Sequence, residues 1–376
     1  MAEQKSFSKI GILGMGRMAV GLAIDLALKG IRVDMIDLKA RAKEERTRYK
    51  ENLEEECKTV IKLFGRSIES FPFPLYLHAP AERVYDLIFE GLPEEIPVKQ
   101  GAFSALKQVL GKETLVCSMT STFTVEELAK EIPLPLNILV THFMNPPYLI
   151  PFLEVVPCPK MDSAVVDRLF TFLRTVGHVP IRCKSSPGFV ISRLQLCLMN
   201  EAVRIMEEGV ASPEDIDKAI QYGWGYRFPV RGILEFIDVG GLEILYHASR
   251  SVSEGLNRPD LLPPKLIEDR FGQGAIGTKA LKGIFEYKSY EQIKRKEMER
   301  HEDDGTIRRA ALAAPQVPGG RAVSGAAEAH HPQRRSRRHG RQGTEPEPAG
   351  HPGGDREEPC GGLQGGSRHG AHPRAR

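Results

Sequence analysis

A glycine-rich segment near the start of the chain constrains the fold more than any other feature. The apolar run KIGILG leads into residues 14–19 (GMGRMA), which end in Met18 and Ala19, and the helical pattern VGLAIDLALKG follows. In this G-x-G-x-x-A spacing, Gly14 permits a tight turn, Gly16 lets a ligand approach the backbone, and the small Ala19 lets helix and strand pack closely. A helix N-terminus favours anions, so the segment predicts a strand–turn–helix unit that binds a diphosphate.

The next strand-like run supports a dinucleotide as the ligand. The run VDMIDL carries Asp37 about 20 residues past the glycines. A carboxylate there accepts hydrogen bonds from ribose hydroxyls and repels a 2′-phosphate, which favours NAD over NADP. Nearby Lys39 and Arg41 leave some use of NADP open. The alternative is a structural glycine turn followed by an exposed aspartate. The predicted cofactor-binding residues are Gly14, Gly16, Met18, Ala19 and Asp37.

Between about residues 8 and 185, short apolar runs alternate with helical stretches. The expected strands are KIGILG, RVDMID, DLIFEG, TLVCSM, NILVTH and FLEVVP. Strands that alternate with helices indicate βαβ units and a parallel sheet. The sequence therefore predicts an α/β, Rossmann-type NAD-binding domain over residues 1–185. One charged segment, Lys39–Phe64, is longer than a simple crossover needs, and we expect it to protrude.

An all-helical domain is predicted over residues 186–300, where the strand pattern ends. Pro187 and Gly188 open the helix FVISRLQLCLMNEAVRIMEEG, which is apolar on nearly all sides. Such a helix is expected to be central and buried. Ser212 then begins a second helix as its N-cap, with Pro213 in the first helical position.

Residues 301–376 differ in composition from the rest of the chain. Segments such as HHPQRRSRRHGRQG are rich in Arg, Gly, Pro and His and hold almost no large apolar side chains. They cannot bury enough apolar surface to offset their ordering entropy, so we predict a disordered, low-complexity tail. Two other interpretations stay open. One is an Arg-rich arm for nucleic acid, which the interspersed acidic residues disfavour. The other is an artefact of a frameshift near residue 305.

Charge and cysteine usage narrow the class of protein. The formal net charge of +3 is too small to indicate nucleic acid or a membrane surface as a partner. No apolar run reaches the roughly 20 residues that span a bilayer, and the first residues lack the apolar core of a signal peptide. The six cysteines form no CxxC pair and no His–Cys cluster at metal spacing. We expect a cytoplasmic, metal-free protein.

A histidine, an asparagine and a glutamate form the candidate catalytic group. His142 and Asn145 lie three apart in a proline-stiffened segment after NILV, and Glu154 follows in a returning strand-like run. Oxidising an alcohol requires a base for the hydroxyl proton while hydride leaves for the nicotinamide. Histidine suits this role, and a carboxylate on its far nitrogen would orient it. The residue types and their spacing alone also fit the alternative of a loop histidine with satisfied hydrogen bonds, an N-cap asparagine and a surface glutamate.

Residues 8 to about 300 resemble the 3-hydroxyacyl-CoA dehydrogenase family, which includes the λ-crystallin and L-gulonate 3-dehydrogenase branch. The matching motifs occur in the family's order: GxGxMA, YDLIFEGLPEE, CSMTST, THFMNPPYLIPFLEVVP, SPGFVISRL and GWGYRFP. This resemblance implies NAD-dependent oxidation of a 3-hydroxyacyl-CoA, such as 3-hydroxybutyryl-CoA, by a homodimer paired through the helical domain. The roles that it implies are His142 as general base, Glu154 as its partner, Asn145 on the substrate carbonyl, Ser121 on the substrate oxygen, and Glu90 and Lys99 near the nicotinamide.

Two departures from the family pattern leave the substrate open. Met119 and Ser192 stand where acyl-CoA enzymes commonly carry asparagine. The stretch NPPYLIP is more similar to the branch that acts on free hydroxy acids, and IFEYKSYEQIKRK resembles a dehydrogenase of pyridoxine degradation. The alternatives are therefore the same chemistry on a free hydroxy acid or heterocyclic carboxylate, and a non-catalytic, crystallin-like protein.

Overall fold

The computed structural model describes residues 7–39, 42–65, 74–76, 84–107, 110–131 and 137–295. The predicted tail over residues 301–376 lies outside the described residues, as does Arg41.

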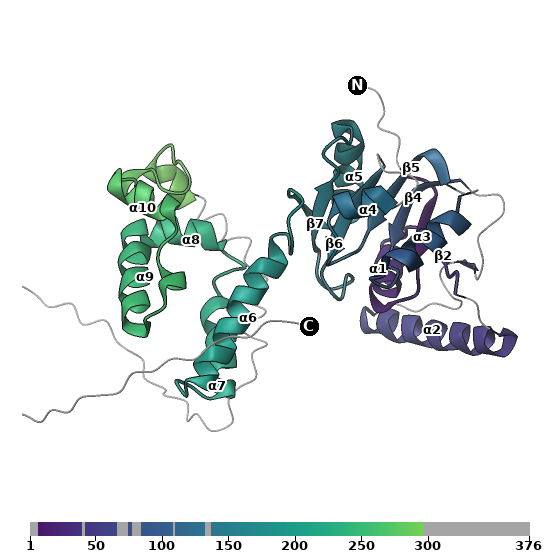
Figure 1. Cartoon of the computed structure of the whole chain (residues 1–376), viewed down its shortest axis with the longest axis horizontal. Coiled ribbons are helices and arrows are strands. Elements are labelled where there is room, and N and C mark those ends of the chain that lie inside the picture. Colours follow the sequence, from purple (N-terminus) through teal and green to yellow (C-terminus); the bar gives the residue numbers. More distant parts are fainter. Residues whose placement is uncertain are drawn as a thin grey trace, which may run out of the picture. The chain divides into compact units, whose positions relative to one another are not determined.

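An eight-stranded sheet organises the first half of the chain (Figure 1). Its strands are β1 (Ile10–Leu13), β2 (Val33–Ile36), β3 (Leu75–Tyr76), β4 (Tyr85–Glu90), β5 (Leu110–Ser118), β6 (Ile138–Phe143), β7 (Phe152–Pro157) and β8 (Val179–Arg182). They lie in the order β3-β2-β1-β4-β5-β6-β7-β8. The direction of winding reverses between β1 and β4, which is the switch point of a Rossmann-type sheet. The predicted fold class is confirmed.

One strand pair departs from the expected parallel sheet. β6 and β7 are antiparallel, whereas the other neighbouring pairs are parallel. Only residues 144–151 join these two strands, and a parallel connection needs a crossover of about a dozen residues or more. The short link therefore forces the chain to turn back on itself.

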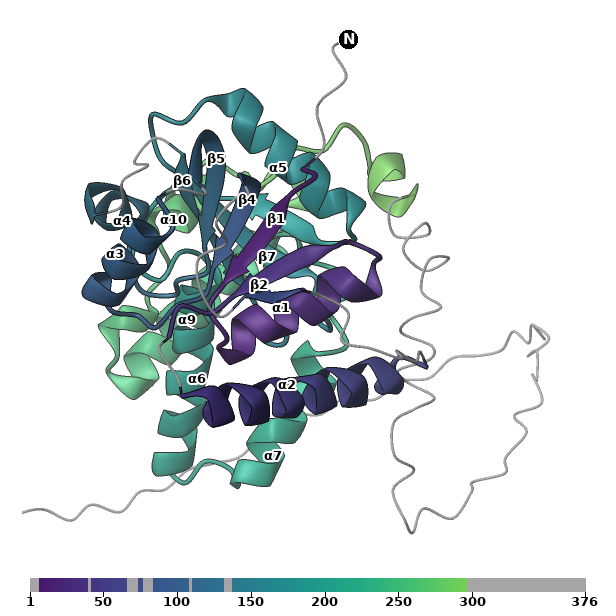
Figure 2. The ribbon, with the colours of Figure 1, turned by 90° about the vertical axis from the view of Figure 1, so that its right-hand side faces the viewer.

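Helices cover both faces of the sheet (Figure 2). The helices α1 (Arg17–Leu28), α2 (Lys43–Leu63) and α5 (Ser163–Thr175) pack on one face, and α3 (Ile96–Ala105) and α4 (Val125–Glu131) pack on the other. Leu53, Cys57 and Ile61 of α2 are buried at four-residue spacing in the α1-side core. One face of α2 is therefore packed on the core through an apolar stripe with helical spacing. The expectation that the segment protrudes is wrong for the residues on this face.

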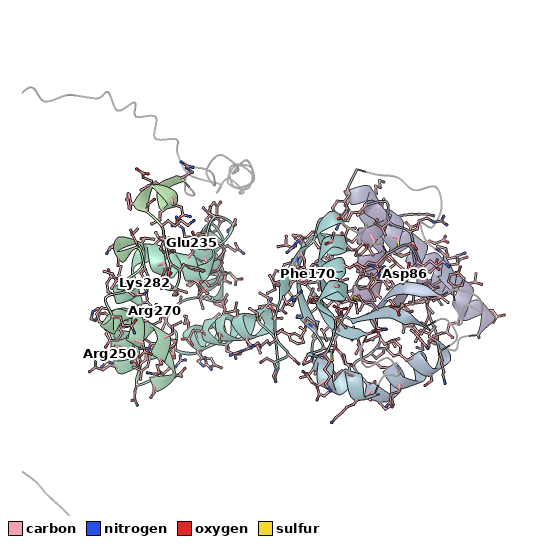
Figure 3. All side chains as sticks on the ribbon, turned by 90° about the horizontal axis from the view of Figure 1, so that it is seen from above. Asp86, Phe170, Glu235, Arg250, Arg270 and Lys282 are labelled. Atoms are coloured by element: carbon pink, nitrogen blue, oxygen red, sulfur yellow. The ribbon has the colours of Figure 1, made fainter. Side chains whose placement is uncertain are left out.

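Polar and cation–π contacts fix the ends of the sheet. Asp86 accepts hydrogen bonds from Ser8 N, Ser8 Oγ and Lys9 N, at 2.9, 2.8 and 2.9 Å. Burial raises the pKa of Asp86, but these hydrogen bonds outweigh it and hold the pKa below its ordinary value. Figure 3 labels Asp86 and also Phe170 of α5. The guanidinium groups of Arg174 and Arg182 lie over the Phe170 ring, 5.3 and 5.5 Å from its centroid. These contacts hold the segment before β1 and the edge strand β8.

The second half of the described chain is helical. Its helices are α6 (Ile191–Glu207), α7 (Pro213–Lys218), the π-helix η1 (Ala219–Trp224), α8 (Ile233–Gly240), α9 (Leu242–Leu256), the 3₁₀ turn η2 (Pro259–Leu261), α10 (Lys265–Gly272) and the 3₁₀ turn η3 (Thr278–Ala280). Ser212 caps α7, as predicted, by accepting a hydrogen bond from Asp215 N at 3.2 Å. Among the described residues, no helix has the length and apolarity needed to cross a membrane.

The apolar helix α6 does not form a buried core in the single chain. None of its residues is buried, and Leu194, Leu198 and Met199 are 52%, 41% and 58% exposed. The expectation of a central, buried helix is therefore wrong for the isolated chain. Its apolar side chains stand on a face that no described element of this chain covers.

Candidate active site

A cavity of about 800 Å³ opens at the carboxyl ends of β1, β2 and β4. It lies at the switch point, where open α/β sheets bind their ligands. Its walls come from the glycine turn, the residues after β2, the loop after β4, the helix α3, the loop after β5 and Tyr49 of α2. The lining residues include Gly14, Gly16, Arg17, Met18, Asp37, Lys39, Gly91, Glu94, Met119 and Ser121.

The glycine turn leaves room that a side chain would fill. Gly14 has φ of +101°, and a Cβ there would lie 2.6 Å from Gly91 O. Gly16 immediately precedes α1 and provides no side-chain cap, so the N–H groups of the first helical turn have no side-chain acceptor from that position. These features fit a diphosphate held by backbone N–H groups at a helix N-terminus.

Small residues also bring α1 and β4 close together behind the turn. Ala19 is fully buried, and a Cβ on Gly91 would lie 3.1 Å from Ala19 Cβ and 2.6 Å from Met119 Cε. The backbone of Gly91 is itself fixed because its N–H donates to Leu13 O at 2.8 Å. Ala19 therefore acts through packing, whereas Met18 lies on the cavity wall.

Asp37 completes the features that suit NAD. It directly follows β2, is 5% exposed and lines the cavity. Its Oδ1 accepts a hydrogen bond from Lys39 N at 3.0 Å. The carboxylate is thus held at the strand end, where a ribose diol would bind. The turn and the carboxylate together fit NAD, which supplies the hydride acceptor when bound.

Asp37→Ser tests this preference. The substitution removes the charge that repels a 2′-phosphate and leaves Lys39 in place, so the ratio of NADH to NADPH affinity should fall by at least about tenfold. Fluorescence titration with both cofactors measures it. Glu44→Ser, which removes an exposed carboxylate in the first turn of α2, is the matched control. An unchanged ratio in Asp37→Ser would show that Asp37 does not select the cofactor.

Glu90 and Lys99 form a buried ion pair behind the cavity wall. Lys99 Nζ lies 2.6 Å from Glu90 Oε1, and the two side chains are 1% and 0% exposed. Leu92 N donates to the same oxygen at 2.7 Å, and Ser118 Oγ donates to Oε2 at 2.5 Å. The network braces the turn after β4. Glu90 and Lys99, which the resemblance places near the nicotinamide, therefore lie behind the residues that line the cavity and hold the turn after β4 in place.

Glu94 was not predicted from the sequence, yet its carboxylate lies on the cavity wall. It accepts hydrogen bonds from Thr120 Oγ1 at 2.8 Å and Ser121 N at 2.9 Å, and Lys99 Nζ lies 3.6 Å away. It therefore links the loops that follow β4 and β5. Its position in the loop after a strand, at the carboxyl edge of a parallel sheet, was the signal available in the sequence.

His142 and Glu154 face each other across β6 and β7. They are directly paired in the antiparallel register, and His142 Nδ1 lies 2.7 Å from Glu154 Oε2. His142 is 5% exposed and Glu154 is fully buried. An ionised carboxylate can only accept at this contact, so Nδ1 is the donor, and in a neutral imidazole the lone pair is then on Nε2. This arrangement can remove a proton from a substrate hydroxyl.

The other two predicted catalytic residues lie in the loops that follow β5 and β6. Ser121 is exposed on the cavity wall, and Asn145 is exposed at the start of the β6–β7 link, where the Asn145–Pro146 bond is cis. Met119 lines the cavity, and Ser192 is the second residue of α6. Among the described residues, no group of three or more His, Cys, Asp or Glu side chains could hold a metal ion.

A cysteine near the pair is poorly suited to act as a nucleophile. Cys183 follows β8, and burial, followed by the nearby Glu154 carboxylate, raises the pKa of its thiol to about 11. The thiol therefore stays protonated at neutral pH, and a thiol is a much weaker nucleophile than a thiolate.

Comparison with known protein families agrees with this architecture. Residues 9–186 match the NAD-binding domain of 3-hydroxyacyl-CoA dehydrogenase, and residues 188–287 match the C-terminal domain of the same enzymes. The two matches together span the sheet and most of the described helical region.

Individual relatives carry different names. The chain is 31% identical to a 5-formyl-3-hydroxy-2-methylpyridine 4-carboxylate 5-dehydrogenase from Mesorhizobium japonicum, over 80% of this chain and 97% of the relative. It is 28% identical to a 3-hydroxybutyryl-CoA dehydrogenase from Mycobacterium tuberculosis, over 75% and 99%. Its structure is similar to that of a 3-hydroxyacyl-CoA dehydrogenase from Archaeoglobus fulgidus, with a TM-score of 0.63, 25% identity and coverage of 81% and 99%.

Proposed function

The chain belongs to the 3-hydroxyacyl-CoA dehydrogenase family, and from this premise we propose that it oxidises the hydroxyl group of a 3-hydroxyacyl-CoA to the 3-oxo product with NAD. The observation that supports this chemistry is the 2.7 Å contact between His142 Nδ1 and Glu154 Oε2. It leaves a histidine nitrogen free as the base that the reaction needs.

Each residue of the site has a separate task in this proposal. His142 Nε2 accepts the hydroxyl proton, and Glu154 holds the Nδ1 proton and stabilises the imidazolium that results. Ser121 and Asn145 orient the substrate oxygen atoms through hydrogen bonds. Gly14 and Gly16 admit the cofactor diphosphate, and Asp37 binds the ribose. The expected gain from a positioned base is about 10²–10⁴-fold in rate.

A free carboxylate is the second candidate substrate. The relative that is 31% identical over most of both chains is named for a pyridine carboxylate and not for a CoA ester. Met119 also lies on the cavity wall, where a thioether replaces the amide common in acyl-CoA enzymes. Both observations favour the same base chemistry on a heterocyclic carboxylate or a free hydroxy acid.

A substrate panel separates the two candidates. NADH formation is measured with 3-hydroxybutyryl-CoA, with free 3-hydroxybutyrate, with L-gulonate, and with a formyl-pyridine carboxylate, whose hydrate offers the hydroxyl group. The proposal expects kcat/KM for the CoA ester to exceed that for free 3-hydroxybutyrate by at least about 100-fold, because remote binding energy lowers the barrier. Turnover of a free acid without any turnover of the ester would contradict the acyl-CoA assignment and support the second candidate.

The exposed apolar side chains of α6 support a homodimer as the working form. An exposed apolar face of this kind is typical of a subunit interface. Light scattering of the purified chain should therefore give twice the mass of 41.8 kDa for one chain. A monomer at micromolar concentration would contradict this part of the proposal.

A further inference from the structure

The turn before α6 holds an aromatic residue in an unfavourable backbone conformation. Phe189 has φ of +45°, in the left-handed region that residues with a Cβ rarely adopt, and Gly188 before it has φ of +72°. The other described non-glycine residues with positive φ, Asn257 and Leu281, each follow the last residue of a helical segment. Phe189 lies before a helix, where no C-terminal cap accounts for the strain. Such strain persists only where surrounding contacts fix it.

The backbone contacts of this turn converge on Glu154. Phe189 N donates to Ser186 O at 3.0 Å, which closes the turn. The next two N–H groups, of Val190 and Ile191, both donate to Glu154 Oε1, at 2.7 and 2.9 Å. Consecutive backbone N–H groups directed at one point form a concavity that binds anions. Because Glu154 Oε2 contacts His142, one buried carboxylate joins the strained turn to the base.

The side chain of Phe189 contacts the base itself. Its ring centroid lies 5.7 Å from that of the His142 imidazole, with an angle of 49° between the planes. Phe189 is 4% exposed. It packs in the hydrophobic cluster on the α3 side of the sheet, and the other buried members of that cluster among the described residues lie at Val156 or earlier in the chain. A flat ring in this place restricts the rotation of the imidazole and keeps water from that side.

We propose that Phe189 is a positioning residue for His142, an inference that rests on the function proposed above. The ring holds the imidazole in the orientation that presents Nε2 to the substrate. The left-handed backbone presents two N–H groups to Glu154 Oε1, which keeps Oε2 on Nδ1. Loss of the ring lets the imidazole occupy other orientations, so the base is correctly aligned for a smaller fraction of the time.

Two substitutions separate the ring from the backbone. Phe189→Gly retains a residue that favours the left-handed turn but removes the ring, and Phe189→Leu retains apolar volume without a flat face. In Phe189→Gly we expect kcat to fall by about 10- to 100-fold, because small misplacements of catalytic groups have effects of this size. KM for NAD should stay within about twofold, because Phe189 does not line the cofactor cavity. Phe189→Leu should lie between Phe189→Gly and the wild type.

A matched control accounts for the loss of a buried ring. Phe172 of α5 is also buried and packs edge-on against Phe7, with ring centroids 5.5 Å apart, in the core on the other face of the sheet. Phe172→Leu should therefore leave kcat and the pH profile of kcat/KM unchanged. If it lowers kcat as much as Phe189→Leu, the effect is general loss of packing and the proposal is wrong.

A readout without substrate separates this inference from the proposed function. Nitrogen-15 NMR of histidine-labelled protein reports which ring nitrogen carries the proton, and the His142 signals are those missing in His142→Gln. The wild type should show one tautomer with Nδ1 protonated, and Phe189→Gly should show averaged signals.

If folded Phe189→Gly and Phe189→Leu retain the wild-type signals, kcat and pH profile, the proposal is wrong. Should Phe189→Gly fail to fold, Phe189→Leu alone decides by the same criteria. Full turnover in His142→Gln would instead contradict the proposed base, while the NMR comparison would still test the Phe189 contact.

Discussion

Replacement of His142 with glutamine is expected to lower kcat by about 10²–10⁴-fold, the range for loss of a general base. Glutamine can still donate a hydrogen bond to Glu154, so the buried carboxylate keeps a partner. It has no nitrogen that accepts a proton at neutral pH, so deprotonation of the substrate must proceed without a base. Initial rates of NADH formation measure the loss, and an NADH titration should give an affinity within about twofold of the wild type.

His178 provides the matched control for this substitution. It is also a buried histidine of the sheet domain, and its Nε2 lies 2.9 Å from Asp25 Oδ2. His178→Gln therefore changes the same residue type in a similar environment, but away from the Glu154 carboxylate. It should keep kcat within about threefold, even if the protein becomes less stable. Equal losses in the two variants would mean that kcat responds to damage of the fold and not to removal of a base.

Gly14→Ala is expected to weaken NAD binding by at least about 100-fold. The added Cβ would lie 2.6 Å from Gly91 O, and alanine is disfavoured at φ of +101°. Either the turn moves, which displaces the N-terminus of α1 from the diphosphate, or Gly91 and the end of β4 shift to make room for the added Cβ. The strain should also lower the free energy of unfolding by about 1–3 kcal/mol. Calorimetric titration and thermal unfolding measure the two effects separately.

Substitutions at two further glycines separate the effect of backbone strain on stability from the effect of the added Cβ on NAD binding. Gly30 also has a positive φ, of +77°, but its Cβ would meet nothing within 4 Å. Gly30→Ala should therefore lower stability while leaving NAD affinity unchanged. At Gly16 a Cβ would lie 3.7 Å from Gly91 O, an ordinary contact. Gly16→Ala should weaken NAD binding with little loss of stability. If Gly14→Ala binds NAD as the wild type does, the turn is not the diphosphate site.

The sequence predicted the six strands whose side chains are mostly buried. YDLIFE and ILVTHF form β4 and β6 because their side chains are buried in the middle of the sheet. The edge strands β3 and β8 were not predicted. β8 has the sequence VPIR, whose first and last residues are exposed, and whose Pro180 is tolerated because the strand lies at the edge. Edge strands obtain their order from a neighbouring strand, which a local pattern cannot reveal.

Within the site, the local sequence was sufficient to locate residues on a strand, at its end or in a turn, while the roles of these residues stay predictions. Gly14, Asp37 and His142 each lie at a strand end or on a strand whose position the local sequence determines. Glu94 was not predicted because its place on the cavity wall depends on Thr120 and Ser121 in another loop. Phe189 was not predicted because its contact with His142 spans 47 residues of chain, counted from 142 to 189.

The antiparallel link between β6 and β7 has a consequence for insertions and deletions. Because neighbouring residues of a strand point to opposite faces, Glu154 meets His142 only in the observed register. Removal of one residue from the connection 144–151 could preserve both strands and still turn the carboxylate to the far side of the sheet. The length of this short connection is therefore as much a part of the chemistry as the two side chains, and natural variants should change its residues far more readily than their number.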